Sequence, residues 1–346
     1  MPSSSLVRVA CFAVGAVVGG GVATALGANR KKEAAVVPAA RPAEPAPPVH
    51  VGPKGETRVS VAPGPLVPGA HLSKYSNPVP VNDVLERQAY VAAYDRRLRH
   101  PAWTAEHLTL SSLGRSAIKG LSSDDEKGDR GKSAFAEDEA IPLPFRARLQ
   151  DYFRSGYDRG HMVPAADAKI SQSAMDETFL LTNIAPQVGA GFNRHYWAYL
   201  EDWCRRLTGS FSDVYVFTVP LYLPRKDGDG KWRVTYEVIG NPPNVAVPTH
   251  FAKVVLTTRP SSPSTPDVHE ISTGAFVLPN AIIPDEAPLE TFVVPIDTVE
   301  RAAGFTLISD AIKAKSKHIC KTTKCEVIVR RFDDAQKKTK AIAGPR

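Results

Sequence analysis

Two polar clusters in the middle of the chain have the residue types and spacing that phosphodiester hydrolysis requires. Residues 158–161 read Asp-Arg-Gly-His, and a carboxamide and a carboxylate, Asn193 and Glu201, follow at a helical spacing. A neutral imidazole accepts a proton near physiological pH, whereas a guanidinium stays charged and pairs with two phosphate oxygens. The first cluster therefore predicts a general base, His161, beside a phosphate-binding group, Arg159. The glycine between them is expected to let the backbone approach a ligand.

Asn193 and Glu201 supply oxygen donors of the kind that Mg²⁺ prefers. On one helix their separation of eight residues corresponds to a rise of about 12 Å, so the two side chains cannot clasp one ion directly. A magnesium site with few protein ligands and several waters suits this pair, whereas zinc requires histidine or thiolate ligands. The alternative is that Asn193 caps a helix and Glu201 lies on a solvated face. Asp158 is expected to orient its neighbours without binding the metal.

The elements that must position these residues form one α+β domain, because strand and helix signals mix without a regular βαβ alternation. Apolar residues recur at three- and four-residue steps over 193–207, which predicts a long helix. Two strands joined by a hairpin are predicted over 88–94 and 102–108, and buried strands over 214–219 and 251–256. Residues 232–239 alternate apolar and polar, and Asp297 is expected to cap a short helix over 298–303.

The first 69 residues of the chain differ in composition from the rest. Residues 1–33 contain serines and basic residues but no acid before Glu33, and the uncharged run 10–28 is close to the ~20 residues that cross a bilayer. This segment is predicted to target the chain to mitochondria and to anchor it in the inner membrane, with a secretory signal as the alternative. Residues 34–69 are a proline-rich, disordered linker, residues 70–332 the folded domain and residues 333–346 a basic flexible tail.

Charge and cysteine content add two weaker constraints. The chain of 346 residues has a formal charge of +7 and a pI near 9.2, which favours acidic partners such as nucleic acid or an anionic membrane. Cys320 and Cys325 are spaced like half of a zinc site, but no second pair stands at a suitable distance. The sequence leaves two possibilities for these cysteines, two free thiols or a disulfide.

The two catalytic clusters resemble the DNA/RNA non-specific endonuclease family, and within it the mitochondrial endonuclease G branch in its fungal form. The resemblance rests on three runs in the right order: YDRGHMVPAAD at 157–167, FLLTNIAPQ at 179–187 and FNRHYWAYLE at 192–201. It extends from about residue 75 to residue 332 and includes 245–253 and 277–280.

This resemblance implies a ββα-metal nuclease fold, with a central, mainly antiparallel sheet flanked by helices. It implies that His161 is the general base and Asn193 the direct ligand of Mg²⁺, with Mn²⁺ as the alternative ion. It further implies that Glu201 positions metal-bound water and that Arg159 stabilises the charge that develops on the phosphate. The family also uses an upstream arginine, for which Arg130 is the nearest candidate.

The function implied by the resemblance is hydrolysis of DNA and RNA to 5′-phosphate ends. The enzyme is expected to be a homodimer in the mitochondrial inner membrane or intermembrane space, and to degrade nuclear DNA after release. The alternative is a catalytically inactive nucleic-acid-binding protein on the same fold, against which the presence of His161, Asn193 and Glu201 argues. The chain departs from the family pattern at Arg194, where glutamine is common, and at Val219, where glycine is common.

Overall fold

The computed structural model describes residues 50–51, 57–58, 82–115 and 127–329. The chain divides into two compact units, Met1–Asn77 and Pro78–Arg346. In the first unit the described residues are two short antiparallel strands, β1 (His50–Val51) and β2 (Thr57–Arg58), within the segment predicted to be a linker. The predicted targeting segment and the predicted tail lie outside the described residues. Among the residues that are described, no helix combines the length and apolar character needed to cross a bilayer.

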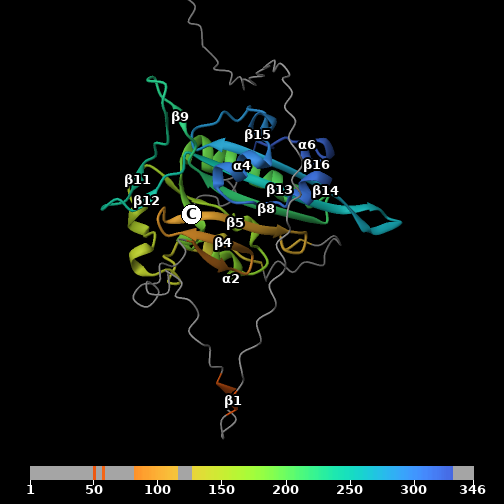
Figure 1. The fold of residues 1–346 in the computed structure, drawn as a ribbon, viewed down its shortest axis with the longest axis horizontal. Helices are drawn as coiled ribbons and strands as arrows, with labels where there is room; N and C mark the ends of the chain where they lie inside the picture. The colour runs from red at the N-terminus through yellow and green to blue at the C-terminus, as the bar shows by residue number, and fades with distance from the viewer. Residues whose placement is uncertain (1–49, 52–56, 59–81, 116–126, 330–346) are drawn as a thin grey trace, which may run out of the picture. The chain divides into compact units, whose positions relative to one another are not determined.

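An eight-stranded sheet forms the centre of the second unit. Its strands lie in the order β15-β14-β13-β8-β5-β4-β3, all antiparallel to their neighbours, and β16 pairs with β14 in parallel. Figure 1 shows β4, β5, β8, β13 and β14 following one another across this sheet. The strands are β3 (Asn82–Glu86), β4 (Tyr90–Asp95), β5 (His100–Leu108), β8 (Asp213–Leu221), β13 (His250–Ser262), β14 (Thr265–Pro279), β15 (Val293–Val294) and β16 (Lys317–His318). The predicted mainly antiparallel sheet is confirmed.

The predicted strands differ from the observed ones mainly at their ends. The hairpin of β4 and β5 is confirmed, and β8 and β13 are both longer than their apolar runs. Strand β13 continues to Ser262 because its polar end pairs with β14 alone, and an exposed pairing leaves no apolar pattern. The alternating run 232–239 does not form one continuous strand. Only β10 (Trp232–Arg233) and β11 (Val238–Ile239) form there, each paired with one two-residue strand, β9 (Arg225–Lys226) or β12 (Val245–Ala246).

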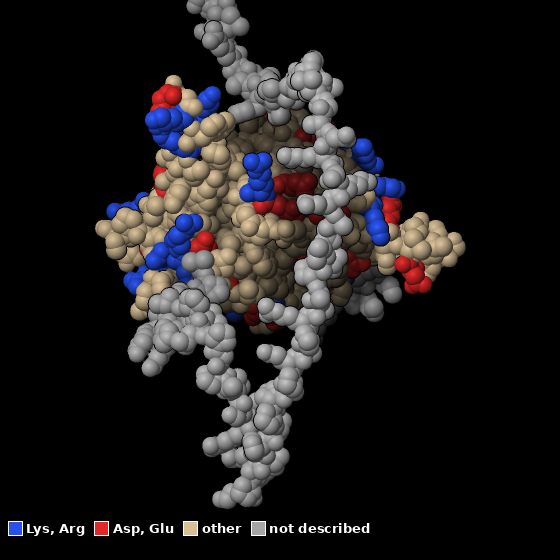
Figure 2. Space-filling model, in the orientation of Figure 1, with Lys and Arg blue, Asp and Glu red and all other residues tan. Residues whose placement is uncertain are grey.

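The sheet is covered on both faces. Successive residues of a strand point to opposite faces, so Phe251 and Val255 of β13 pack under helix α3 (Trp197–Leu207), whereas Val254 packs under α4 (Ile296–Ala303). Helix α5 (Asp310–Lys315) follows α4, and the ammonium of Lys313 pairs at 2.6 Å with both Asp297 and Glu300. Figure 2 shows the acidic side chains gathered beside α4.

Two predicted helix starts are wrong. Residue Pro295 occupies the N-cap position of α4, so Asp297 lies inside the first turn and pairs with Lys313 without capping the helix. The long helix predicted from residue 193 begins as α3 only at Trp197. A wider, π-helical segment, η7 (Gly189–Tyr196), precedes it, and Gly191 within that segment has a φ of 81°. A Cβ at Gly191 would lie 2.6 Å from Ile282, so both backbone and space require glycine there.

Cys320 and Cys325 form a disulfide, which decides between the two alternatives. Cys320 belongs to the short helix α6 (Ile319–Thr322), and Cys325 packs into the same core as α3. The indole of Trp203 on α3 donates a hydrogen bond of 3.0 Å to the carbonyl of Lys324, inside the closed loop. The disulfide loop therefore packs against α3 through Trp203.

Candidate active site

A small ββα unit carries both polar clusters. Strand β6 (Asp158–His161) pairs antiparallel with β7 (Ile184–Gln187), and β7 leads through η7 into α3. His161 is the last residue of its strand. Gly160 is required for another reason than close approach of a ligand: a Cβ there would collide with the buried side chain of Gln187 on the neighbouring strand. The glycine therefore fixes the pairing of the two strands.

All five candidate residues line one cavity of about 880 Å³: Arg130, Arg159, His161, Asn193 and Glu201. Arg130 comes from η2 (Arg130–Lys132), a 3-10 turn far from the other residues in sequence. Sequence reasoning selected it only as the nearest upstream arginine, and the structure brings it to the same cavity. Arg205 of α3 also lines the cavity and was missed. Its spacing of four residues from Glu201, on the same side of the helix, is the signal that was available.

The imidazole of His161 is held between aromatic rings. Its ring centroid lies 5.3 Å from that of Phe135 and 4.7 Å from that of Phe179, which it meets edge-on. Burial lowers the pKa of His161 to about 3, and the positive charge of Arg130 contributes in the same direction. The ring is therefore neutral at physiological pH. Nε2 is buried and has no hydrogen-bond partner within the described part of the chain, which leaves this nitrogen able to accept a proton.

Two arginines are fixed by the same rings. The guanidinium of Arg159 lies 4.7 Å from the centroid of Phe135, and that of Arg130 lies 5.4 Å from the centroid of Phe179. Both side chains belong to exposed residues, and neither has a carboxylate within 4.0 Å among residues 82–115 and 127–329. Cation–π contact orients a guanidinium without neutralising it. Both arginines are thus preorganised to bind an anion.

The carboxylate of Asp158 accepts hydrogen bonds from both Asn193 and Arg194 and so orients both side chains. The Asn193 amide donates a hydrogen bond of 2.9 Å to Asp158, and Arg194 donates two, of 2.7 and 2.6 Å. Burial raises the pKa of Asp158, but these hydrogen bonds outweigh it and hold the pKa below its usual value. Since the NH₂ group of Asn193 faces a carboxylate, its carbonyl oxygen is the atom left for a cation. The prediction that Asp158 orients its neighbours agrees with this geometry.

Glu201 and Arg205 form the helical wall of the cavity. Burial raises the pKa of Glu201 to about 7, against the opposing effect of the positive charges of Lys253 and Arg205. Arg205 donates a hydrogen bond of 2.7 Å to the buried carboxylate of Asp167 in η5 (Ala165–Asp167). A carboxyl group with a pKa near 7 is readily ionised by an approaching cation.

The donor set fits a hard divalent cation. The side chains available to it are a carbonyl oxygen of Asn193 and a carboxylate of Glu201, which are the ligand types that Mg²⁺, Mn²⁺ and Ca²⁺ accept. Within the described ranges no group of three or more His, Cys, Asp or Glu side chains is arranged to hold a metal ion.

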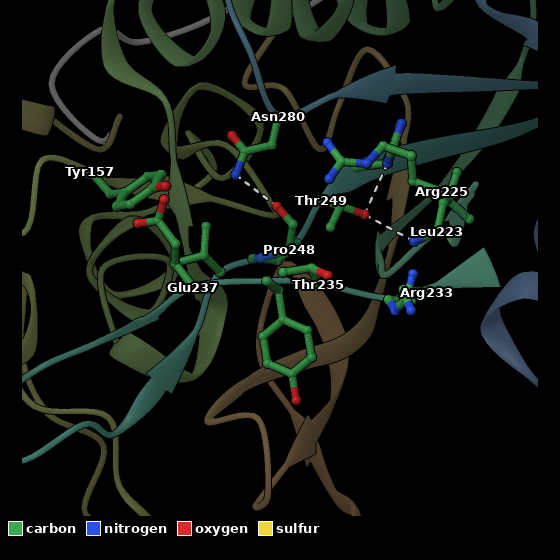
Figure 3. A pocket seen from close by; sticks show the side chains of 12 residues that line it. Tyr157, Leu223, Arg225, Arg233, Thr235, Glu237, Pro248, Thr249 and Asn280 are labelled. Carbon is green, nitrogen blue, oxygen red and sulfur yellow. Dashed lines mark hydrogen bonds between the residues drawn. The ribbon is translucent and has the colours of Figure 1, made fainter. Parts of the chain in front are cut away.

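A second cavity of about 410 Å³ is lined by Tyr157, which directly precedes β6, by Asn280 and by residues between 223 and 250. In Figure 3 the side chains of Tyr157 and Glu237 face one another at one end, and Arg225 and Arg233 lie at the other. Asn280 links this cavity to strand β7 and the residue that follows it. Its amide donates hydrogen bonds of 2.9 and 3.1 Å to the carbonyls of Pro248 and Pro186, and its oxygen accepts one from the backbone of Val188. No candidate catalytic residue lines this cavity.

The chain is similar to known nucleases. A family model described as DNA/RNA non-specific endonuclease matches residues 68–313. The mitochondrial nuclease of Saccharomyces cerevisiae is 49% identical over 263 residues, which cover 76% of each chain. The mitochondrial endonuclease G of Bos taurus is 40% identical over 255 residues, 72% of this chain and 78% of that protein.

A solved structure is similar in fold as well. The crystal structure of the EndoG/EndoGI complex, which addresses the mechanism of EndoG inhibition, contains a chain 42% identical to this one. The match has a TM-score of 0.60 and covers 74% of this chain and 97% of the other.

Proposed function

Because this chain belongs to the DNA/RNA non-specific endonuclease family and is an endonuclease that acts on nucleic acid, we propose that His161 is its general base and that Asn193 holds its divalent metal ion. The observation that carries this assignment is the cavity itself. Among the described residues it joins a neutral imidazole whose Nε2 has no hydrogen-bond partner, two arginines with no carboxylate within 4.0 Å, and an oriented amide oxygen. A nucleic-acid-binding module has no use for the first and last of these.

The arginines receive the scissile phosphate. Arg159 and Arg130 are oriented over their rings before substrate arrives, so little side-chain freedom is lost when a phosphate binds. Their guanidinium groups match phosphate oxygens and make no contact that distinguishes bases. This explains why one cavity accepts both DNA and RNA.

His161 then activates water. Its Nε2 takes a proton as the water oxygen forms a bond to phosphorus, and the bond from phosphorus to the 3′ oxygen breaks. The departing 3′ oxygen takes a proton from solvent water, which leaves a 5′ phosphate and a 3′ hydroxyl. The negative phosphate beside the ring opposes the effect of burial and raises the pKa of His161 while substrate is bound. Asn193 and Glu201 would hold Mg²⁺, with Glu201 orienting water in its shell, and the bound ion supplies positive charge for the transition state.

Digestion of supercoiled plasmid and of RNA tests whether cleavage requires a divalent metal ion and whether the fragments carry 5′ phosphates. The protein without residues 1–69 is expected to cut both in Mg²⁺ or Mn²⁺ and neither in EDTA. The fragments should be substrates for a ligase without prior phosphorylation, because their ends carry 5′ phosphates. Undiminished cutting in EDTA, or fragments that a kinase must phosphorylate first, would contradict the proposal.

We also place the enzyme in the inner membrane or intermembrane space of mitochondria. The composition of residues 1–33 and the mitochondrial names of the relatives support this location. A fluorescent fusion of the full chain should resist protease in intact mitochondria and become accessible when the outer membrane is opened. A fusion without residues 1–33 that still localises there would argue against the role of this segment.

A homodimer is proposed as the working form. Four apolar side chains, at Trp232, Val234, Tyr236 and Val238, alternate along one segment and are all exposed. Alternating apolar residues without a covering layer are typical of a surface that meets another chain. Light scattering after gel filtration is expected to give twice the mass of one chain for the parent protein. The double variant Trp232→Lys, Val234→Lys is expected to give the mass of a single chain. A monomeric parent protein would refute this assignment.

A further inference from the structure

The turn that carries Asn193 departs from helical geometry just before the proposed metal ligand. Within η7, Ala190 has φ −70° and ψ 137°, and Gly191 has φ 81° and ψ −16°, so neither residue continues a helical pattern. The backbone N–H groups at the start of a helix have no acceptor inside the helix and need one from elsewhere. The N–H of Gly191 therefore needs a partner that regular helical hydrogen bonding does not supply.

The side chain of His195 is this partner. Its Nδ1 accepts a hydrogen bond of 2.9 Å from the N–H of Gly191. A ring nitrogen that accepts a hydrogen bond carries no proton, so the proton of the neutral imidazole lies on Nε2. The ring is half-buried, lines the catalytic cavity and meets the ring of Tyr199 edge-on, with 6.5 Å between the two centroids. His195 thus closes a turn of five residues that has Asn193 at its centre.

Three backbone hydrogen bonds hold the same turn from outside. The carbonyl of Gly191 accepts one of 3.2 Å from the N–H of Ile283. The N–H of Asn193 donates one of 2.9 Å to the carbonyl of Val188, whose own N–H donates one of 2.9 Å to the side chain of Asn280. The main chain before Asn193 is therefore fixed at several points, and the hydrogen bond to His195 joins it to the main chain that follows.

We infer that His195 is a positioning residue for the metal ligand: its Nδ1 holds Gly191 and thereby sets the direction in which the carbonyl oxygen of Asn193 points. The inference rests on the proposed function, because it assumes that Asn193 holds the ion. Asp158 fixes the amide group of Asn193 by a hydrogen bond from strand β6, whereas His195 fixes the main chain that carries this side chain. Groups that orient a ligand without touching the ion contribute to metal affinity.

The same hydrogen bond occurs at a second helix start, which offers a matched control. His318 occupies the N-cap position of α6, and its Nδ1 accepts a hydrogen bond of 3.2 Å from the N–H of Cys320. His318 does not line the catalytic cavity. The donor and acceptor types are thus the same, but this turn encloses no proposed metal ligand.

A crossed pair of variants separates the acceptor atom from the ring. His195→Phe keeps a ring beside Tyr199 but removes the acceptor, whereas His195→Asn removes the ring but keeps an oxygen near the position of Nδ1. We expect His195→Phe to weaken binding of Mn²⁺ by about tenfold, the lower end of what loss of an orienting group causes. His195→Asn should keep most of the parent affinity. Titration followed by electron paramagnetic resonance measures both without turnover.

Two further measurements distinguish positioning from a general loss of stability. His318→Ala is expected to lower the melting temperature but to keep the parent affinity for Mn²⁺. In the metal-free protein, hydrogen–deuterium exchange at the N–H of Gly191 should be faster in His195→Phe than in the parent, and His195→Asn should restore its protection. In an Asn193→Ala background, His195→Phe should cause no further loss of Mn²⁺ affinity, because the ligand through which it acts is gone.

Equal losses of Mn²⁺ affinity in His195→Phe and His195→Asn would overturn the inference, since Nε2 would then be the atom that matters, in direct contact with the ion. Unchanged protection of the Gly191 N–H in His195→Phe would overturn it as well. Should His195→Phe fail to fold, His195→Ala takes its place in the same comparison. Failure of the proposed function looks different, because the parent protein would then lack metal-dependent cleavage and Asn193→Ala would keep the parent affinity for Mn²⁺.

Discussion

The catalytic cavity and the second cavity contain similar residues that are differently paired. Each is lined by at least one histidine and at least two arginines. In the catalytic cavity Arg130 and Arg159 lie over phenylalanine rings. In the second cavity Arg233 pairs with Asp227 and Asp229 at 2.9 and 2.7 Å, and Arg225 pairs with Asp227 at 3.5 Å.

The difference shows that pairing decides what an arginine can do. A guanidinium over an aromatic ring keeps its charge for a ligand, whereas one between two aspartates is already neutralised. The histidines differ in the same sense. Nε2 of His161 has no partner in the described ranges, while Nδ1 of His250 lies 2.9 Å from the hydroxyl of Thr249. Residue type alone would have made both cavities candidates.

The largest expected difference between the cavities concerns their histidines. His161→Ala should lower kcat for plasmid nicking by about 10²–10⁴-fold, because the general base is lost. His250→Ala, the matched change in the second cavity, should keep the parent kcat. Circular dichroism and a gel-shift assay check that both variants fold and bind DNA. Equal losses in the two variants would remove the distinction between the cavities.

The second-largest expected difference concerns the aspartates that pair with arginines in each cavity, and it is measured as affinity for Mn²⁺. Asp158→Ala releases the Asn193 amide and is expected to weaken binding of Mn²⁺ roughly 10–100-fold, as loss of an orienting partner does. Asp227→Ala releases arginines in the second cavity and should leave Mn²⁺ affinity unchanged. Titration followed by electron paramagnetic resonance measures both without any turnover. An unchanged affinity in Asp158→Ala would show that Asn193 does not need this support.

A smaller effect is expected from pH. Burial raises the pKa of Glu201 to about 7, so its carboxylate is mostly protonated at pH 6 and mostly ionised at pH 8. Cation affinity should therefore rise with pH across this interval, by at most about tenfold per unit. Glu201→Gln should flatten the dependence, and Glu237→Gln in the second cavity should not. A rise that persists in Glu201→Gln would assign the titration to another group.

The smallest expected effect is on salt dependence. Each arginine that binds a phosphate contributes about one unit to the slope of log affinity against log salt. Arg159→Ala should lower the slope for DNA binding accordingly. Arg225→Ala should leave it unchanged, since that side chain already faces Asp227. Equal changes in both variants would place DNA on both cavities.

Sequence reasoning found the residues that lie close together along the chain or match a family run. His161, Arg159, Asn193 and Glu201 belong to that group. Arg205 was not found, although its position four residues after Glu201 places both side chains on the same side of α3. Its ion pair with Asp167 was not predictable, because the two residues lie 38 positions apart and meet only through the fold.

The fold shows the same division between local and tertiary information. The apolar period of α3 and the cores of β8 and β13 were predictable because burial leaves a repeating pattern. The start of α3 at Trp197 was not, since it depends on Gly191 and on Ile282 from a distant segment. The run 232–239 has the alternation that is typical of a half-buried strand, but its apolar side chains are exposed. Alternation alone does not say whether another layer covers the apolar side chains.

Because Cys320 and Cys325 form a disulfide, the covalent structure of the mature protein depends on the redox conditions of the compartment in which it folds. In a reducing cytosol the two side chains are thiols, because disulfides persist in oxidising compartments. The cysteines are only five positions apart, so closing this loop restricts the unfolded chain little. The core around α3 can thus assemble during synthesis, and oxidation afterwards locks the segment against Trp203. Protein purified from a reducing host should first be analysed by mass spectrometry for the two missing hydrogens that report this bond.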